Sequence, residues 1–135
     1  MPTPGRQPAA ASKRLSPHFL ASEFAQHDGR DRTPAEQLYW LTRLCTVYLE
    51  PLRAKFGPVT IVSGFRSPSY NAGVGGAPAS FHTRRPDRRG AAADVKCARG
   101  RSSDWYRFLD SLDPGGLGIY PTWVHVDNRA GRARW

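Results

Sequence analysis

Hydrophobic residues recur at helical spacing in the first half of the chain. Thr33, Pro34 and Glu36 precede this stretch, where threonine can cap a helix, proline fits its first position and glutamate completes a capping box. The periodic positions are Leu38, Leu41, Leu44, Cys45, Tyr48 and Leu52. The pattern predicts a helix from Thr33 to about Phe56, which Pro51 kinks or splits.

The second half of the chain reads mainly as short strands. Residues 59–63 and 92–96 are short runs of apolar and β-branched character that predict two strands, and residues 117–120 and 123–127 predict a hairpin. Between them, Ser102 or Ser103 is expected to cap a second helix through about Leu112. The elements predict one α+β domain, with a small antiparallel sheet packed on the helices.

Alternation within the last predicted strand separates two kinds of side chain. Val124 and Val126 point one way, into the core, and Trp123, His125 and Asp127 point the other way. An imidazole between an indole and a carboxylate can be a half-exposed histidine held by Asp127. It can equally be a group directed into a cleft.

The length and the net charge of the chain limit its domain organisation and the kinds of partner that it can bind. The 135 residues predict a single domain over residues 15–129, between a flexible basic tail at 1–14 and a basic tail at 130–135. No apolar run is long enough to span a membrane, and the first residues do not resemble a secretory signal. The net charge of +9 indicates either a basic surface or an anionic partner, nucleic acid or an acidic cell-wall polymer. Cys45 is expected to be a buried free thiol.

Three residues carry the candidate chemistry. His82, Asp94 and His125 supply two imidazoles and one carboxylate. Taken singly, each has an ordinary structural explanation, such as a loop histidine or a carboxylate that pairs with arginine. Taken together, they suit zinc better than magnesium or calcium, and they leave a coordination position open, as in a catalytic site.

Several motifs in order resemble a known family. They are Ser63-Gly64-Phe65-Arg66-Ser67-Pro68, Asn71-Ala72-Gly73-Val74-Gly75-Gly76-Ala77, Ser80-Phe81-His82, Gly90-Ala91-Ala92-Ala93-Asp94, Gly116-Leu117-Gly118-Ile119-Tyr120-Pro121 and Val124-His125-Val126-Asp127. Over about Leu15 to Arg129, the chain is similar to the zinc D-Ala-D-Ala carboxypeptidases, peptidoglycan peptidases of bacteria and their phages. They belong to the lysostaphin/D-Ala-D-Ala/hedgehog-like metallopeptidases.

The resemblance implies roles for individual residues. His82, Asp94 and His125 would hold Zn²⁺, which would activate a water molecule and polarise the scissile carbonyl. Arg66 would bind a substrate carboxylate through its planar guanidinium. Ser80 and Tyr120 would contact the substrate or the developing oxyanion.

Two departures from the family pattern bear on catalysis. The usual His-x-x-Gly-x-Ala-x-Asp spacing is lengthened, because Asp94 lies 12 residues after His82; Asp87 is a rival ligand without the Gly-x-Ala context. The inserted residues would bring arginines to the mouth of the cleft. Several members carry an acid three residues before the last histidine, where this chain has Thr122. Asp127 would then be either the general base or a partner that orients His125 or Arg129.

The expected function is zinc-dependent hydrolysis of an amide bond in peptidoglycan peptides, as a D,D-carboxypeptidase or an endopeptidase. The alternative is a structural module of the same fold that docks on the wall or in a phage particle, with weak or no catalysis. The expected partners are a peptidoglycan peptide, an anionic cell-wall polymer and other phage structural proteins, and the protein would reach the wall by lysis or on a virion. No nucleic-acid partner is expected, because no nucleic-acid motif is present.

Overall fold

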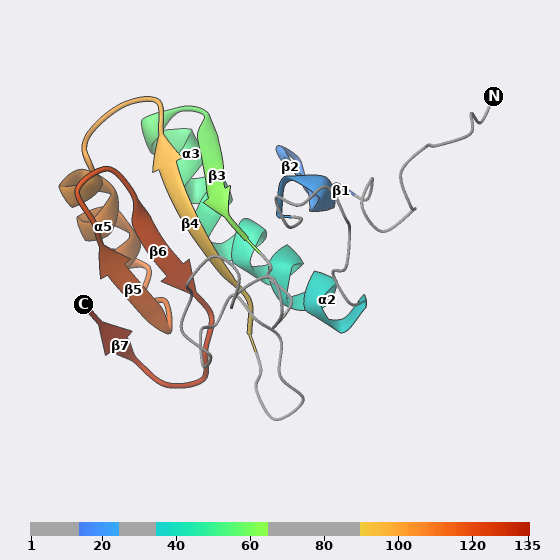
Figure 1. Ribbon diagram of the computed structural model, residues 1–135. Coiled ribbons are helices and arrows are strands. Elements are labelled where there is room, and N and C mark those ends of the chain that lie inside the picture. Colours follow the sequence, from blue (N-terminus) through green and yellow to red (C-terminus); the bar gives the residue numbers. More distant parts are fainter. Residues whose placement is uncertain (1–13, 25–34, 65–89) are drawn as a thin grey trace, which may run out of the picture.

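A computed structural model describes residues 14–24, 35–64 and 90–135 of the chain. Its elements are β1 (Arg14–Ser16), β2 (Phe19–Leu20), η1 (Ala21–Phe24), α2 (Ala35–Leu44), η2 (Cys45–Leu49), α3 (Glu50–Phe56), β3 (Val59–Ser63), β4 (Ala92–Cys97), α5 (Ser102–Ser111), β5 (Gly116–Ile119), β6 (Val124–Asp127) and β7 (Ala133–Arg134). Helices α2, α3 and α5 pack on one face of the larger sheet (Figure 1). The expected α+β class is confirmed.

The larger sheet has five strands in the order β3-β4-β6-β5-β7. The first four pair antiparallel, as expected, but β7 pairs parallel to β5. The sheet is therefore mixed. The segment 130–135, expected as a basic tail, forms part of it: the Ile119 amide donates to the Trp135 carbonyl at 2.8 Å, and the Trp135 amide donates to the Leu117 carbonyl at 3.1 Å.

The two faces of the sheet differ in chemistry. Val95, Val124 and Val126 are fully buried in the core, which they share with residues of the helices. The alternate positions of β4 and β6 carry polar side chains, so that His125 and Asp127 share the face away from the helices. The predicted alternation of residues 123–127 is confirmed, and it places the polar set on one side of the sheet.

The long helix predicted up to Phe56 is interrupted. Between α2 and α3, residues Cys45–Leu49 form a π-helical turn, and the Glu50 amide donates to the Cys45 carbonyl. Pro51 follows directly; it has no N–H, and its ring excludes ordinary helical packing against the preceding turn. The expected split at Pro51 is confirmed, as is the end at Phe56, whereas the predicted cap at Thr33 lies outside the described residues.

The start of α5 differs from the expectation. Neither Ser102 nor Ser103 is the capping residue; Arg101 occupies that position. The Asp104 carboxylate accepts a hydrogen bond from the Arg101 amide at 2.8 Å and so satisfies the backbone N–H of the capping residue. The predicted end near Leu112 agrees with the observed last residue, Ser111.

Glu50 ties the N-terminal β1–β2 segment to the helices. Its carboxylate accepts hydrogen bonds from the Ser16 hydroxyl at 2.6 Å and the His18 amide at 2.8 Å, and it lies 2.7 Å from His18 Nδ1. Burial acts to raise the pKa of Glu50, but these hydrogen bonds outweigh it and hold the pKa below its usual value. Phe19 and Phe24 of the same segment are buried in the core.

Both cysteines are free thiols, and Cys45 is buried, as predicted. Burial raises the pKa of each to about 12, so neither is a reactive thiolate near neutral pH. Within the described part of the chain, no helix has the length and apolar character needed to cross a membrane.

Candidate functional site

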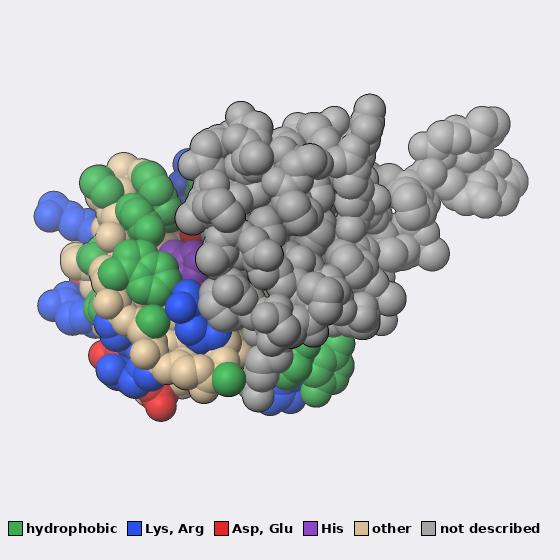
Figure 2. All heavy atoms as spheres, turned by 60° about the horizontal axis from the view of Figure 1, so that its bottom comes forward, with side chains coloured by type: hydrophobic (Ala, Val, Ile, Leu, Met, Phe, Trp, Pro, Cys, Tyr) green, Lys and Arg blue, Asp and Glu red, His purple; other side chains and the backbone are tan. Residues whose placement is uncertain are grey.

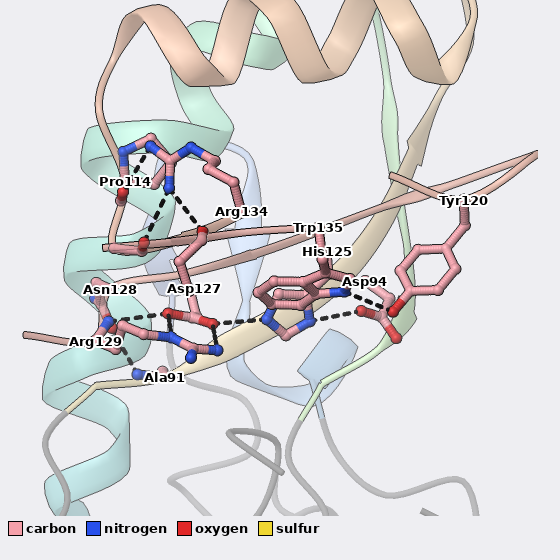
Figure 3. A network of polar contacts seen from close by, with 12 residues as sticks. Ala91, Asp94, Pro114, Tyr120, His125, Asp127, Asn128, Arg129, Arg134 and Trp135 are labelled. Carbon is pink, nitrogen blue, oxygen red and sulfur yellow. Dashed lines mark hydrogen bonds and ion pairs between the residues drawn. The ribbon is translucent and has the colours of Figure 1, made fainter. Parts of the chain in front are cut away.

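Asp94 and His125 meet because of strand register. They lie directly opposite each other in the antiparallel pair β4–β6. Opposed residues of such a pair place their Cβ atoms within about 5 Å, on the same face of the sheet. The His125 Nδ1 atom lies 3.0 Å from Asp94 Oδ1, and both side chains are largely shielded from solvent (Figure 3).

Asp127 holds the other side of the His125 ring. Its Oδ2 atom lies 2.7 Å from His125 Nε2 and accepts a 2.7 Å hydrogen bond from Arg129 Nη2. Its Oδ1 atom accepts from the Arg129 backbone amide at 3.0 Å and from Arg129 Nε at 2.9 Å. The side chain has no solvent exposure, and both of its oxygens are engaged.

The charges of this cluster favour an ionised Asp127. Burial acts to raise the pKa of Asp127, but hydrogen bonds from His125 and Arg129 outweigh it and hold the pKa far below its usual range. Burial acts to lower the pKa of His125, but its contacts with Asp127 and Asp94 prevail and raise it. A bound cation at Nδ1 would replace the proton there.

The hydrogen bond to Asp127 decides how His125 can be used. When Nε2 donates its proton to the ionised Asp127 and a cation replaces the proton on Nδ1, the lone pair of Nδ1 faces the side of Asp94. A carboxylate oxygen and an imidazole nitrogen thus converge on one point. A histidine held by a carboxylate through its distal nitrogen is the usual arrangement around protein-bound zinc. The donor set therefore fits the metal.

Two glycines of β5 make room for the cluster. Gly116 lies opposite Asp127, and a Cβ atom at Gly116 would stand 2.2 Å from Asp127 Oδ2. A Cβ atom at Gly118 would stand 2.4 Å from the indole Nε1 of Trp135. A side chain at either position would force Asp127 or Trp135 to move, so the Gly-x-Gly pattern of β5 serves the site rather than a turn.

Asn128 fastens the end of β6 to two other elements. Its Oδ1 atom accepts from the Ala91 amide at 2.6 Å, and its Nδ2 atom donates to the Trp40 carbonyl at 3.0 Å. The side chain is buried, so both amide groups need these partners. Asn128 thereby holds the start of β4, which carries Asp94, against β6 and α2.

Of the residues predicted for the site, the structure brings Asp94, His125 and Asp127 together. Tyr120 stacks on Trp123, with ring centroids 4.8 Å apart, and its hydroxyl accepts from Trp135 Nε1 at 2.9 Å. The remaining predicted site residues, with the rival ligand, lie outside the described residues: Arg66, Ser80, His82 and Asp87. Residues 14–24, 35–64 and 90–135 hold no group of three or more His, Cys, Asp or Glu placed to bind a metal ion.

Sequence reasoning missed four residues that build the site, Gly116, Gly118, Asn128 and Trp135, whereas the contact of Asp127 with Arg129 was one of the expectations. The alternate glycines of the strand opposite the histidine were a usable signal, because a strand interior rarely tolerates two of them without cause. Thr122, which stands where several family members have an acid, is exposed in the turn between β5 and β6.

The surroundings of the site are mixed in character. Histidine and acidic side chains come to the surface on one side of the molecule, with hydrophobic and basic side chains near them (Figure 2). Among protein families, the family described as Peptidase M15 matches residues 14–127 of the chain. Neither curated proteins nor solved structures match the chain.

Proposed function

Because the chain belongs to the peptidase M15 family, we propose that it is a zinc-dependent peptidase that hydrolyses an amide bond in peptidoglycan peptides. The bond is cut either at a terminal D-alanine, by a D,D-carboxypeptidase, or internally, by an endopeptidase. The observation that carries the proposal is the pair of donors, Asp94 Oδ1 and His125 Nδ1, 3.0 Å apart on one face of the sheet, with His125 held from behind by Asp127.

Each predicted site residue has a defined task in this proposal. His82, Asp94 and His125 hold the ion, which when bound activates water as the nucleophile and polarises the scissile carbonyl. Arg66 binds a substrate carboxylate. Ser80 and Tyr120 contact the substrate. Since the Tyr120 oxygen accepts from Trp135, its own hydrogen can be donated to a substrate oxygen.

Of the two roles open to Asp127, burial supports orientation. A general base must reach the proton that it removes, directly or through one water. The Asp127 side chain has no exposure, and its oxygens are engaged by His125 and Arg129. Asp127 therefore keeps the proton of His125 on Nε2 and stabilises the ring in one orientation.

A second candidate follows from the same residues. With Asp127 enclosed and Thr122 unable to take a proton near neutral pH, the described residues offer no obvious general base. This favours, as the alternative, a wall-docking or phage-particle module of the same fold with weak catalysis. Its partners would be the peptidoglycan peptide, an anionic cell-wall polymer or other phage structural proteins.

Mass spectrometry of defined muropeptides decides between these functions. The zinc-loaded protein is incubated with them beside a chelated sample, a His125→Ala variant and a His18→Ala control. His18 is half-exposed and contacts Glu50 rather than the site. Loss of one terminal alanine identifies a carboxypeptidase, and an internal cut identifies an endopeptidase. Absence of product from protein that holds one zinc, together with binding to insoluble peptidoglycan, favours the docking module; activity that survives in His125→Ala contradicts the peptidase.

A further inference from the structure

Trp135 lies against the metal-binding histidine. Its backbone is fixed beside β5 by hydrogen bonds with Ile119 and Leu117. Its indole packs over Gly118, where a Cβ atom would stand 2.4 Å from Nε1 and 2.5 Å from Cε2. The ring centroids of Trp135 and His125 are 4.9 Å apart with an interplanar angle of 44° (Figure 3). Residue 135 lies beyond the part of the chain that the family match covers.

Trp135 contacts two members of the polar cluster, which consists of Asp94, His125, Asp127 and Arg129. The Arg129 guanidinium lies 5.3 Å from the centre of the indole, and the same guanidinium binds both oxygens of Asp127. Asp127 in turn contacts His125, whose ring meets the indole again. The indole is anchored at its other end by its hydrogen bond to Tyr120. A lone exposed tryptophan needs no explanation, but one that contacts both His125 and Arg129 does.

We propose that Trp135 is a positioning residue, which keeps the His125 ring in the orientation that turns Nδ1 toward Asp94. The proposal rests on the proposed zinc peptidase function, because Nδ1 is the nitrogen that would bind the metal. Asp127 restrains His125 at one point only, Nε2, about which the ring can still tilt. The indole blocks that tilt by occupying the space beside the ring.

Shielding is the second part of the same role. Trp135 is 45% exposed, so part of its surface meets solvent while other parts contact His125 and Arg129. Removal of the indole admits water to the Asp127–Arg129 pair and to the Nε2–Asp127 hydrogen bond. Water then competes for these groups and weakens the electrostatic support of the ring. Groups that orient a metal ligand from behind change metal affinity by about 10–100-fold when they are removed.

The test compares zinc affinity in three variants, measured by competition with a fluorescent chelator. Trp135→Ala is expected to bind zinc at least tenfold more weakly than the wild type. Trp135→Phe, which keeps a ring beside His125 but loses the hydrogen bond to Tyr120, is expected to retain most of the wild-type zinc affinity. Gly118→Ala, which pushes the indole aside without altering it, is expected to resemble Trp135→Ala. Gly131→Ala is the matched control, because an added Cβ there meets nothing within 4 Å.

Urea unfolding of each variant separates positioning from a general loss of structure, and a nuclear Overhauser effect between the Trp135 and His125 rings checks the contact in metal-free protein. Unchanged zinc affinity in Trp135→Ala, or absence of that Overhauser effect in the wild type, overturns the proposal. So does a rise in KM with zinc affinity and kcat unaltered, which would make Trp135 a substrate contact only. A wild type that binds zinc but cuts no muropeptide refutes the proposed peptidase, while the zinc comparison still decides the role of Trp135.

Discussion

Replacement of Asp127 by asparagine isolates the part that this carboxylate plays. Asparagine keeps the shape of the side chain but has one acceptor oxygen and one NH₂ group in place of two oxygens. If the oxygen takes the place of Oδ1, it still accepts from Arg129 Nε and from the Arg129 amide. The NH₂ group then faces Arg129 Nη2, another donor, and His125 Nε2.

The consequence for His125 is a change of tautomer. An amide donor beside Nε2 favours a lone pair there and moves the ring proton to Nδ1, which faces Asp94 at 3.0 Å. The proton then sits on the nitrogen that would bind zinc, so zinc affinity is expected to fall about 10–100-fold. The fold also loses stability, because two charge-assisted hydrogen bonds disappear and two donors face each other.

The cost in stability can be bounded. A hydrogen bond to a charged group contributes roughly 1.5–3 kcal/mol, and breaking a buried ion pair from one side costs about 3–5 kcal/mol. The free energy of unfolding of Asp127→Asn is therefore expected to fall by about 3 kcal/mol, which urea titration measures. Asp113→Asn is the control: its side chain is 78% exposed and its ion pairs are 3.4 and 3.5 Å long, so a change of less than about 0.5 kcal/mol is expected.

One result would refute the orienting role. If Asp127→Asn binds zinc as tightly as the wild type but loses more than 100-fold in kcat on muropeptides, Asp127 moves a proton in the reaction and acts as a base. Equal losses of zinc affinity and of activity at subsaturating zinc, with kcat largely restored by saturating zinc, agree with orientation instead.

Three further changes test other contacts. Gly116→Ala should lower the free energy of unfolding in urea by about 1–3 kcal/mol and weaken zinc binding, because its Cβ would overlap Asp127 Oδ2. Gly131→Ala should change neither. Because the pKa of Glu50 is lowered in the folded protein, its contribution to stability is present above the ordinary value of 4.5 and is lost as pH falls below it. Glu50→Gln should therefore flatten the fall of Tm between about pH 6 and pH 3. An unchanged slope of Tm against pH would contradict this. Thr122→Glu should raise kcat on muropeptides by roughly tenfold or more if the missing acid limits the reaction, and equal rates in both proteins would exclude that cause.

Much of the fold was predictable because the spacing of apolar residues in a helix or a strand repeats within a few residues. The helical spacing before Phe56 and the alternation of Val124 and Val126 depend on neighbours within a few residues. The start of α5 was not predictable in the same way. Several side chains near its first turn can satisfy a free backbone amide, and the choice of Asp104 depends on local geometry.

Part of the candidate site was likewise predictable from the pattern within one strand, and part of it was not. Alternation alone placed His125 and Asp127 on one face, because they are two residues apart in one strand. The types of donor, imidazole and carboxylate, are likewise a property of the sequence, and they limit the metal to a few ions. Which nitrogen of His125 is used, and whether Asp127 is open to water, are not properties of that strand.

The sequence by itself determined the helical stretch before Phe56, four of the five strands of the larger sheet and the chemistry available on the two faces of β6. The tertiary structure decided that Asp94 lies opposite His125, that Arg129 and Trp135 enclose Asp127 and His125, and that residues 133–134 join the sheet parallel to β5. The reason is physical: periodicity acts along a few residues of backbone. Register between strands about thirty residues apart, by contrast, depends on how the valines of the core and the space above Gly116 and Gly118 pack together.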